Sequence, residues 1–321
     1  MNKTIKLVTY NIDGLPEKLN LKDLPWILKP VAWIYKLIKK SYEVIINDDE
    51  NKDKYIKQIS VYLSKLKPDI IAVQEDFNYH DELTSKLNTN YNQGTYTGGF
   101  NVSKLFSSME CLSHFPLPRF KADGLNIFTK KSNIQICSEK IVAWNKSYGY
   151  IDHANDILTK KGFRYYNLLL WNKLKLNVYI VHMDADFYHP EKCPDVSKDI
   201  EARKFQFLQL SKFILNEVAN GNNDPTIIMG DINSAPKYHW DVDNIDINLI
   251  HEIEHNTKLH IFEAVPEYFK DVDRIFYINN DDANYSIDII DCFYDFSANE
   301  SKLGKISDHK PFVTSLSITT K

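Results

Sequence analysis

The feature that most restricts the possible folds of this chain is a series of short apolar runs, each followed at once by polar residues. Four of these runs are rich in β-branched residues and have the length of a strand: Ile5–Tyr10, Asp69–Val73, Asn177–Val181 and Thr226–Met229. A strand that is apolar throughout is typical of a sheet that is covered on both faces. We therefore expect buried strands that deliver polar side chains to the edge of a sheet.

Two segments with helical periodicity lie between these runs. The first, 51–66, places apolar residues on one helical face at Tyr55, Ile59, Tyr62, Leu63 and Leu66, and Pro68 follows as a stop. The second, 197–219, does so at Ile200, Phe207, Leu210, Ile214 and Val218. Helices that alternate with buried strands indicate a layered α/β fold.

Two further strands are expected at Arg274–Ile278 and Phe312–Ile318, and here the polar residues precede the strand. A mixed sheet with antiparallel members brings the end of one strand and the start of its neighbour to the same edge. Polar groups from both kinds of strand can therefore meet in one place.

Three motifs at these strand ends carry possible chemistry. Asp231 and Asn233 follow a buried strand through Gly230, and together they can hold a water and a phosphate oxygen. Glu75 ends another strand, where its oxygens suit a hard cation. The pair Asp308-His309 can supply a metal ligand and a proton-transfer group. Each motif alone also fits a solvated turn or a helix cap.

Three weaker motifs are polar strand ends as well. They are the segments around Asn11, His182 and Asp273. The six motifs appear in one order over nearly the whole chain: Tyr-Asn-x-x-Gly, Gln-Glu, a strand-end His, Gly-Asp-x-Asn, Asp-Arg-Ile and Ser-Asp-His.

This ordered set resembles the endonuclease/exonuclease/phosphatase superfamily, which includes DNase I, abasic-site endonucleases, neutral sphingomyelinases and inositol polyphosphate 5-phosphatases. The resemblance implies a four-layer α/β sandwich, with two mixed β-sheets packed face to face and helices outside. It implies one domain over residues 1–321, with an amphipathic insertion at about 15–50. The implied reaction is hydrolysis of a phosphodiester by an activated water.

The resemblance also implies a metal site. Asn11, Glu75 and Asp308 would hold Mg²⁺, or Mn²⁺ in its place, with Glu75 as the principal ligand. The charges agree with this assignment, because carboxylates gathered in one cleft repel each other unless a cation lies between them.

The remaining matching residues take catalytic roles by the same resemblance. Asp231 and Asn233 would position the water and a phosphate oxygen, and His182 would lie on the phosphate side. His309 would be the general base, oriented by Asp273, because a carboxylate fixes the tautomer of a histidine and raises its basicity. Asp231 remains the alternative base.

The substrate is predicted less sharply. Segments 74–80 and 181–185 resemble sphingomyelinase-related members, as does 156–162, where Asp156 precedes Lys161 by five residues. Neutral sphingomyelinases carry a regulatory Asp and Lys in a comparable segment; the alternative for this segment is an exposed turn. Segments 9–15 and 272–276 also resemble 5′-tyrosyl-DNA phosphodiesterases.

We therefore expect a phospholipid head-group phosphodiesterase of sphingomyelinase type. The alternatives are a DNA-directed phosphodiesterase, either a nuclease or a 5′-tyrosyl-DNA phosphodiesterase, then an inositol polyphosphate phosphatase, and a non-catalytic binding module. A net charge of −4 gives no basic footprint for unspecific DNA binding.

The segment 23–40 reads DLPWILKPVAWIYKLIKK and can form a basic amphipathic helix. Such a helix can lie in a membrane interface, so peripheral membrane contact is one expectation and a lid packed on the domain is the other. No apolar run reaches the ~18–20 residues that span a bilayer, and the first strand leaves no room for a signal peptide. We expect an intracellular, cytoplasmic monomer.

Overall fold

The computed structural model describes thirteen stretches of the chain. They are residues 2–13, 52–77, 80–98, 109–110, 119–148, 156, 159–185, 196–234, 253–255, 257–266, 271–281, 283–299 and 307–320. The amphipathic segment 23–40 and most of the insertion expected at about 15–50 lie outside the described residues.

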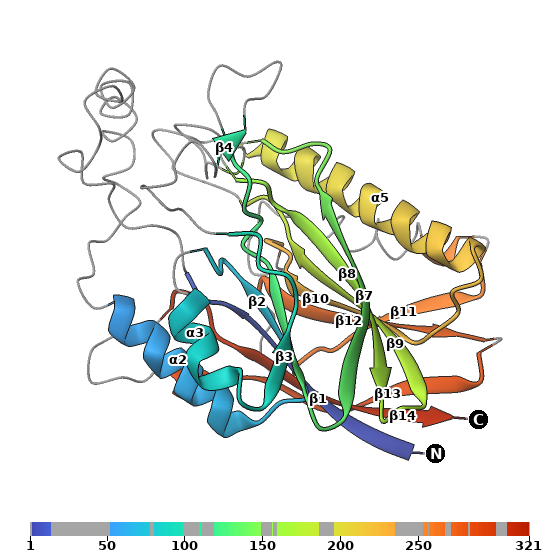
Figure 1. Ribbon diagram of the computed structural model, residues 1–321. Helices are drawn as coiled ribbons and strands as arrows, with labels where there is room; N and C mark the ends of the chain where they lie inside the picture. The colour runs from blue at the N-terminus through green and yellow to red at the C-terminus, as the bar shows by residue number, and fades with distance from the viewer. Residues whose placement is uncertain are drawn as a thin grey trace.

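Two six-stranded sheets form the body of the protein (Figure 1). The first sheet contains, in spatial order, β13 (Tyr285–Tyr294), β14 (Phe312–Thr320), β1 (Asn2–Asn11), β2 (Ile70–Gln74), β6 (Asn126–Lys130) and β3 (Tyr91–Gln93). The pair β1 and β2 is parallel and its neighbours are antiparallel, so the sheet is mixed.

The second sheet is mixed as well. It contains, in spatial order, β11 (Leu259–Glu263), β12 (Asp273–Asn280), β10 (Thr226–Asp231), β9 (Leu174–His182), β8 (Gly162–Leu170) and β7 (Ile134–Ala143). Strands β9 and β10 are parallel, and the other pairs are antiparallel. A separate two-stranded ribbon joins β4 (Met109–Glu110) to β5 (Arg119–Phe120).

The two sheets pack face to face around one hydrophobic core. Alternate residues of each strand enter this core, as Ile5 and Leu7 do from β1, and Ile227 and Met229 do from β10. Because side chains alternate across a strand, the residues in between point to the outer faces. Val8 and Tyr10 lie on the outer face of the first sheet and Ile228 lies on that of the second, where separate apolar clusters form.

Helices cover these outer faces, which gives four layers (Figure 1). Helix α2 (Lys52–Leu66) and α3 (His80–Leu87) pack on the first sheet through Ile56, Ile59 and Leu83. The long helix α5 (Ser197–Ala219) packs on the second sheet through Phe207, Leu210 and Ile214. A short 3-10 helix, η4 (Phe296–Asn299), follows β13.

The α/β sandwich expected from the sequence is therefore confirmed. Each of the six strands and both helices predicted from the periodicity is present, with ends that shift by a few residues. Among the described helices, none combines the length and the apolar character needed to cross a membrane.

Candidate active site

Three strand ends of the second sheet place one polar side chain each at the same edge. In the register of the sheet, Asp231 pairs with His182 on its parallel neighbour β9 and with Asp273 on its antiparallel neighbour β12. All three residues are buried, with exposed fractions of 1%, 1% and 2% for His182, Asp231 and Asp273. The end of β9, the end of β10 and the start of β12 thus form the floor of one site.

Gly230 brings β10 close to β9 just before this floor. Its φ is +148°, and a Cβ atom added there would lie 2.1 Å from the carbonyl oxygen of Val181. Only glycine fits such a close approach of two backbones. The following backbone is held on both sides, because Asp231 accepts a hydrogen bond from the Met183 amide at 3.0 Å and Ile232 donates one to Val272 at 2.9 Å.

The first sheet brings Asn11 and Glu75 to the same place. Asn11 pairs with Gln74 in the parallel register of β1 and β2, and Glu75 follows directly with a left-handed φ of +62°. The Asn11 Nδ2 group donates to Glu75 Oε1 at 3.1 Å and to Asp231 Oδ2 at 3.0 Å. One amide therefore joins a carboxylate of the first sheet to a carboxylate of the second.

His309 and Asp308 complete the site from the turn before β14. The Nδ1 atom of His309 lies 2.6 Å from Asp273 Oδ2, and its Nε2 atom lies 3.9 Å from Asp231 Oδ2. Ser307 holds this turn, because its hydroxyl donates to the Asn11 carbonyl at 2.9 Å and accepts from the His309 amide at 3.1 Å.

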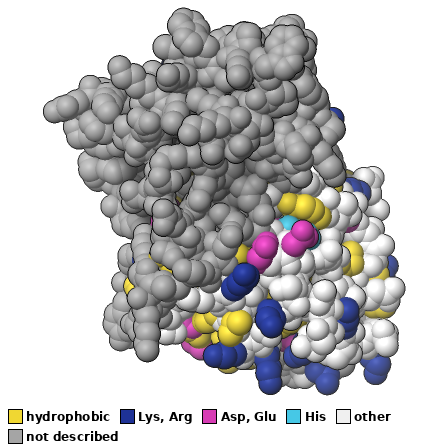
Figure 2. Space-filling view, turned by 60° about the vertical axis from the view of Figure 1, so that its left-hand side comes forward, with side chains coloured by type: hydrophobic (Ala, Val, Ile, Leu, Met, Phe, Trp, Pro, Cys, Tyr) yellow, Lys and Arg dark blue, Asp and Glu magenta, His cyan; other side chains and the backbone are white. Residues whose placement is uncertain are grey.

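Asp308 differs from the rest of the site by its exposure. Its side chain is 63% exposed, and its Oδ1 atom lies 3.9 Å from His309 Nε2. Figure 2 brings the left-hand side of Figure 1 forward. On this face, acidic side chains lie beside a histidine at the border of the described surface. The carboxylates of this site therefore do not all lie at the same depth.

The two histidines of the site have opposite electrostatic surroundings. Burial, together with the positive charges of Lys161 and His309, holds the pKa of His182 well below its ordinary value. Burial alone would lower the pKa of His309 too, but the charges of Asp273 and Asp231 and the hydrogen bond to Asp273 hold it well above that value. His182 is therefore neutral, whereas His309 retains a proton readily.

His182 faces the carboxylates with its Nε2 atom. That atom lies 3.6 Å from Asp231 Oδ2 and 3.9 Å from Glu75 Oε1. The backbone behind the ring is fixed by Trp144, whose Nε1 donates to the His182 carbonyl at 2.8 Å. A neutral imidazole at this position can donate one hydrogen bond into the site.

Two carboxyl groups of the site hold their protons more strongly than usual. Burial raises the pKa of Glu75 to about 7; Asp13 also raises it, while Lys161 and the Asn11 hydrogen bond lower it. Burial likewise raises the pKa of Asp273 to about 7, against the opposing effect of His309. Carboxylates with such pKa values are stabilised by a positive charge placed next to them.

The donor set fits a hard divalent cation. Glu75 and Asp231 offer carboxylate oxygens, which Mg²⁺ and Ca²⁺ prefer. Asn11 turns its Nδ2 group toward both, and its Oδ1 atom accepts from the Asp13 amide at 3.0 Å. The raised pKa of Glu75 shows that the Lys161 charge does not offset the effect of burial, so a cation would stabilise the ionised form. A second grouping exists at Asp231, Asp273 and His309, whose ligand atoms all lie within 4.8 Å of one another. There, however, the short contact between His309 and Asp273 already occupies both groups.

Asn233 follows the Gly-Asp strand end with a left-handed φ of +52°. Its amide donates to Asp231 Oδ1 at 2.9 Å, and its side-chain Nδ2 donates to the Met183 carbonyl at the same distance. Its Oδ1 atom is thus the part of the side chain left to act on a substrate. With Asn233, all of the residues predicted for the site are linked by direct contacts.

Lys161 and Asp156 form a buried ion pair near this group. Their exposed fractions are 9% and 1%, so the interpretation of this segment as an exposed turn is wrong. Asp156 also accepts a hydrogen bond from the Ala185 amide at 2.8 Å, which joins it to the chain after His182. Attraction to Asp156 and Glu75 outweighs the effect of burial and raises the pKa of Lys161, which therefore carries a positive charge into the site.

Sequence reasoning did not assign Trp144 and treated Ser307 only as part of a motif. Trp144 lies in a loop 38 positions from His182, and no local pattern connects the two. Ser307 was visible in the Ser-Asp-His motif, where a hydroxyl two residues before a histidine is typical of a turn that is held by its side chain.

Comparison with known proteins places the chain in a wider group. The model of the Endonuclease/Exonuclease/phosphatase family matches residues 8–309 of this chain. No curated protein sequence matches the chain.

Several solved structures share the fold at low sequence identity. A sphingomyelinase C from Streptomyces griseocarneus is 13% identical with a TM-score of 0.58, and the match covers 98% of this chain and 99% of that chain. A beta toxin variant from Staphylococcus aureus with bound magnesium ions is 17% identical with a TM-score of 0.54, covering 99% and 100%. D. rerio TDP2 complexed with a single strand DNA product is 14% identical with a TM-score of 0.56, covering 98% of each chain.

Proposed function

The chain belongs to the endonuclease/exonuclease/phosphatase family of metal-dependent phosphoesterases, and from this premise we propose that it cleaves the head-group phosphodiester of a phospholipid, in the manner of a sphingomyelinase. The observation that carries the hydrolytic function is the single contact set formed by Asn11, Glu75, Asp231, Asp273 and His309. It joins cation-binding oxygens to an imidazole whose tautomer is fixed.

Glu75 would hold the divalent cation, with Asp308 completing the set from the exposed side. Asn11 would orient Glu75 and Asp231 through its Nδ2 group. The carboxylate of Glu75, whose side chain is 12% exposed and whose pKa is raised to about 7, supports this assignment. When bound, Mg²⁺ would withdraw charge from the phosphoryl group, as divalent cations do in phosphoester hydrolysis.

The residues of the chain position the water and manage its proton. In our proposal the neutral form of His309, rather than Asp231, receives the proton of the attacking water, because Asp273 occupies its Nδ1 atom and its Nε2 atom faces the site. Asp273 keeps Nδ1 protonated and turns Nε2 toward Asp231. Asp231 and the Asn233 side chain then orient the water for in-line attack on phosphorus, a step that depends mainly on positioning.

His182 and Lys161 would meet the negative charge of the phosphate. The depressed pKa of His182 keeps the ring neutral, so it donates a hydrogen bond without adding a charge. Lys161 supplies a buried positive charge in the same region, because attraction to neighbouring carboxylates, Glu75 and Asp184 among them, raises its pKa and keeps it protonated. Positive charge fixed in a dry site stabilises a phosphoryl transition state far more than a solvated charge does.

The buried Asp156–Lys161 pair supports the head-group substrate over the alternatives. It stands where the sequence resembles the regulatory Asp and Lys segment of neutral sphingomyelinases, and it is formed and buried in this fold. The net charge of −4 supports the same choice, because DNA-directed enzymes gain affinity from basic surfaces. The fold shared with TDP2 bound to a DNA product keeps a DNA phosphodiester as the second candidate.

A panel of substrates tests this proposal. The full chain is incubated with Mg²⁺ and, separately, with sphingomyelin, a lysophospholipid, plasmid DNA, 5′-tyrosyl DNA and an inositol polyphosphate. We expect release of phosphocholine from sphingomyelin. Nicked plasmid or freed tyrosine without phosphocholine would replace the lipid substrate by DNA, and inorganic phosphate from the inositol compound would indicate a phosphatase.

A matched pair of histidine variants separates catalysis from folding. His309→Ala should lower turnover by about 10³-fold, the range of general acid–base catalysis, with unchanged circular dichroism. The control is His260→Ala, which removes an exposed imidazole that lies 3.2 Å from Asp281. His260 is on β11 and pairs with Asn279, at the end of β12 that is farther from the site. Equal activity in both variants, or no turnover of any substrate with any divalent cation, would favour a binding module.

A further inference from the structure

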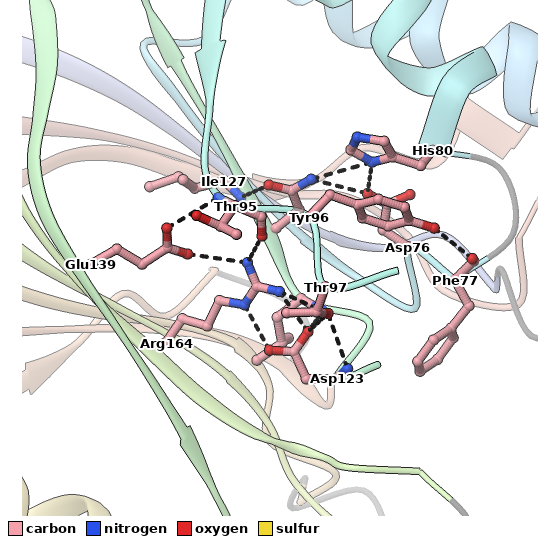
Figure 3. A network of polar contacts seen from close by, with 12 residues as sticks. Asp76, Phe77, His80, Thr95, Tyr96, Thr97, Asp123, Ile127, Glu139 and Arg164 are labelled. Carbon is pink, nitrogen blue, oxygen red and sulfur yellow. Dashed lines mark hydrogen bonds and ion pairs between the residues drawn. The ribbon is translucent and has the colours of Figure 1, made fainter. Parts of the chain in front are cut away.

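The residue after Glu75 is held by a polar network that the reaction itself does not use (Figure 3). Asp76 donates its amide to the Gly124 carbonyl at 2.9 Å, and its Oδ2 atom lies 2.6 Å from His80 Nδ1. Asn126 Nδ2 donates to the same oxygen at 3.1 Å. The His80 ring in turn stacks on Tyr96, with ring centroids 3.7 Å apart and planes 6° from parallel. Asp76 is therefore fixed through both its backbone and its side chain.

The loop that accepts the Asp76 amide is itself held by a neighbouring carboxylate. Asp123 Oδ1 accepts hydrogen bonds from the Leu125 amide at 3.2 Å and from the Thr97 hydroxyl at 2.8 Å. Gly124, between them, has a φ of +67°, and a Cβ atom there would lie 2.4 Å from the Phe77 ring. The conformation of this loop and that of the chain after Glu75 are thus coupled by direct contact.

Arg164 ties this loop to the opposite sheet. It lies on β8 of the second sheet, is fully buried, and binds both oxygens of Asp123, with Nε at 2.7 Å from Oδ2 and Nη2 at 2.6 Å from Oδ1. Its remaining donors reach the Thr95 carbonyl, Glu139 Oε1 at 3.2 Å and Thr97 Oγ1 at 3.2 Å. Such a two-point contact fixes orientation as well as distance, because the guanidinium group is planar and rigid.

Glu75 needs such support. A residue other than glycine with a φ of +62° costs of order 1 kcal/mol or more, and it keeps that conformation only where its surroundings determine it. Buried ion pairs add little net stability compared with apolar residues of the same size. The Arg164–Asp123 pair is thus better explained by the geometry it fixes than by the stability it supplies.

We propose that Arg164 is a positioning residue for the metal site: through Asp123, Gly124 and Asp76 it holds Glu75 in the conformation that binds the divalent cation. This inference rests on the proposed function, which makes Glu75 the principal cation ligand. Groups that orient a metal ligand without touching the metal change its affinity by about 10–100-fold when they are removed.

The test measures Mg²⁺ binding directly, by isothermal titration calorimetry on the full chain without substrate. Arg164→Gln should raise the Kd for Mg²⁺ by about tenfold or more. Arg164→Lys, which keeps the charge but not the two-point geometry, should give a smaller rise. Thr97→Val removes only the hydroxyl shared by Asp123 and Arg164, and it decides the question if the arginine variants fail to fold.

The control is Asn177→Ala. Asn177 is 2% exposed and lies five residues before His182 on β9, where it accepts from the Tyr165 hydroxyl at 2.9 Å and donates to Asn222 at 2.9 Å. Its loss should lower the melting temperature and leave the Kd for Mg²⁺ within about twofold, because additive effects are the rule between distant sites.

The outcomes separate this inference from the proposed function. Wild-type affinity for Mg²⁺ in Arg164→Gln and Thr97→Val, with only a lower melting temperature, would overturn the positioning role and leave the metal site in place. A wild-type chain that binds no Mg²⁺ would overturn the metal assignment and the positioning role together. Weak binding in Asn177→Ala as well would assign the effect to general destabilisation and overturn the inference.

Discussion

Asp273 and His309 form the contact on which proton transfer in the site depends. The distance of 2.6 Å between Oδ2 and Nδ1 is that of a charge-assisted hydrogen bond. Because the Asp273 carboxylate accepts a hydrogen bond from Nδ1 of His309, the other ring nitrogen, Nε2, faces Asp231 and would face the substrate. Asp273 is fixed in turn by Tyr294, whose hydroxyl donates to its backbone carbonyl at 2.7 Å.

Asp273→Asn should lower kcat by about 10²–10⁴-fold, because a neutral amide neither fixes the reactive tautomer nor stabilises the charged ring. The fold should be retained, since the side chains have the same shape. Asp281→Asn is the control, because it changes the exposed carboxylate beside His260. Steady-state kinetics on both variants checks this, and a loss of less than about threefold in Asp273→Asn would contradict the role.

The buried ion pair of Lys161 gives a prediction about stability. Lys161→Met leaves Asp156 buried without its counter-charge, and we expect a loss of about 3–5 kcal/mol in the free energy of unfolding. Lys140→Met is the control. Lys140 also forms a close ion pair, at 2.6 Å from Glu217, but its side chain is 49% exposed. The loss in the free energy of unfolding should therefore stay below about 1 kcal/mol. Urea unfolding measures both, and similar losses would show that Lys161 is solvated in solution.

At the scale of elements, the sequence predicted six of the eight interior strands of the two described sheets, missing β6 and β8, and none of their edge strands. Strands β2 and β10 are buried along their whole length, so their apolar runs were plain. Strands β7 and β13 lie at sheet edges, and each contains a shift in register, between Ile136 and Ser138 and between Ile289 and Asp291. A bulge breaks the two-residue alternation, and therefore these strands were not predicted.

The candidate site could be predicted because its residues stand at strand ends, where a local pattern marks them. No local pattern shows which distant group each of these residues contacts. Asn11 and Asp231 are 220 positions apart, and Arg164 lies 41 positions from Asp123 on the opposite sheet. Lys161 was noticed for its spacing from Asp156, but only the fold shows that both are buried.

The close approach of β9 and β10 makes Gly230 sensitive to any side chain. Gly230→Ala should cost about 3 kcal/mol of stability, because its Cβ would meet the Val181 carbonyl at 2.1 Å and the backbone must move. It should also lower activity by displacing Asp231. The control is Gly221→Ala, at a φ of +88° with no atom within 4 Å, where only backbone strain of about 1 kcal/mol is expected. Equal losses in the two variants would exclude a steric cause.

At the scale of the whole molecule, the site is divided between the two sheets. Asn11 and Glu75 belong to the first sheet, whereas His182, Asp231 and Asp273 belong to the second. The carboxylates that face each other across this boundary repel, and the Asn11 amide is the contact that joins Glu75 to Asp231. A cation bound here would hold the two sheets together.

Mg²⁺ should therefore raise the melting temperature relative to EDTA, by an amount equivalent to about 2.7 kcal/mol at a hundredfold excess over Kd. Glu75→Gln should abolish the rise, because it removes the charge of the principal ligand. Glu217→Gln, a change on the surface pair with Lys140, should keep it. Differential scanning fluorimetry with both additives measures this, and a wild-type curve that is the same in Mg²⁺ and EDTA would contradict the metal site.

The position of β14 between β13 and β1 has a consequence for biosynthesis. Asn2 pairs with Thr319, so β1 is synthesised more than 300 residues before the strand with which it pairs. Until β14 emerges, one edge of β1 stays open, and Ser307 and His309 are made only just before β14. The candidate site therefore cannot be complete until the last strand of this sequence is made, and until then the open edge of β1 is available for wrong pairing.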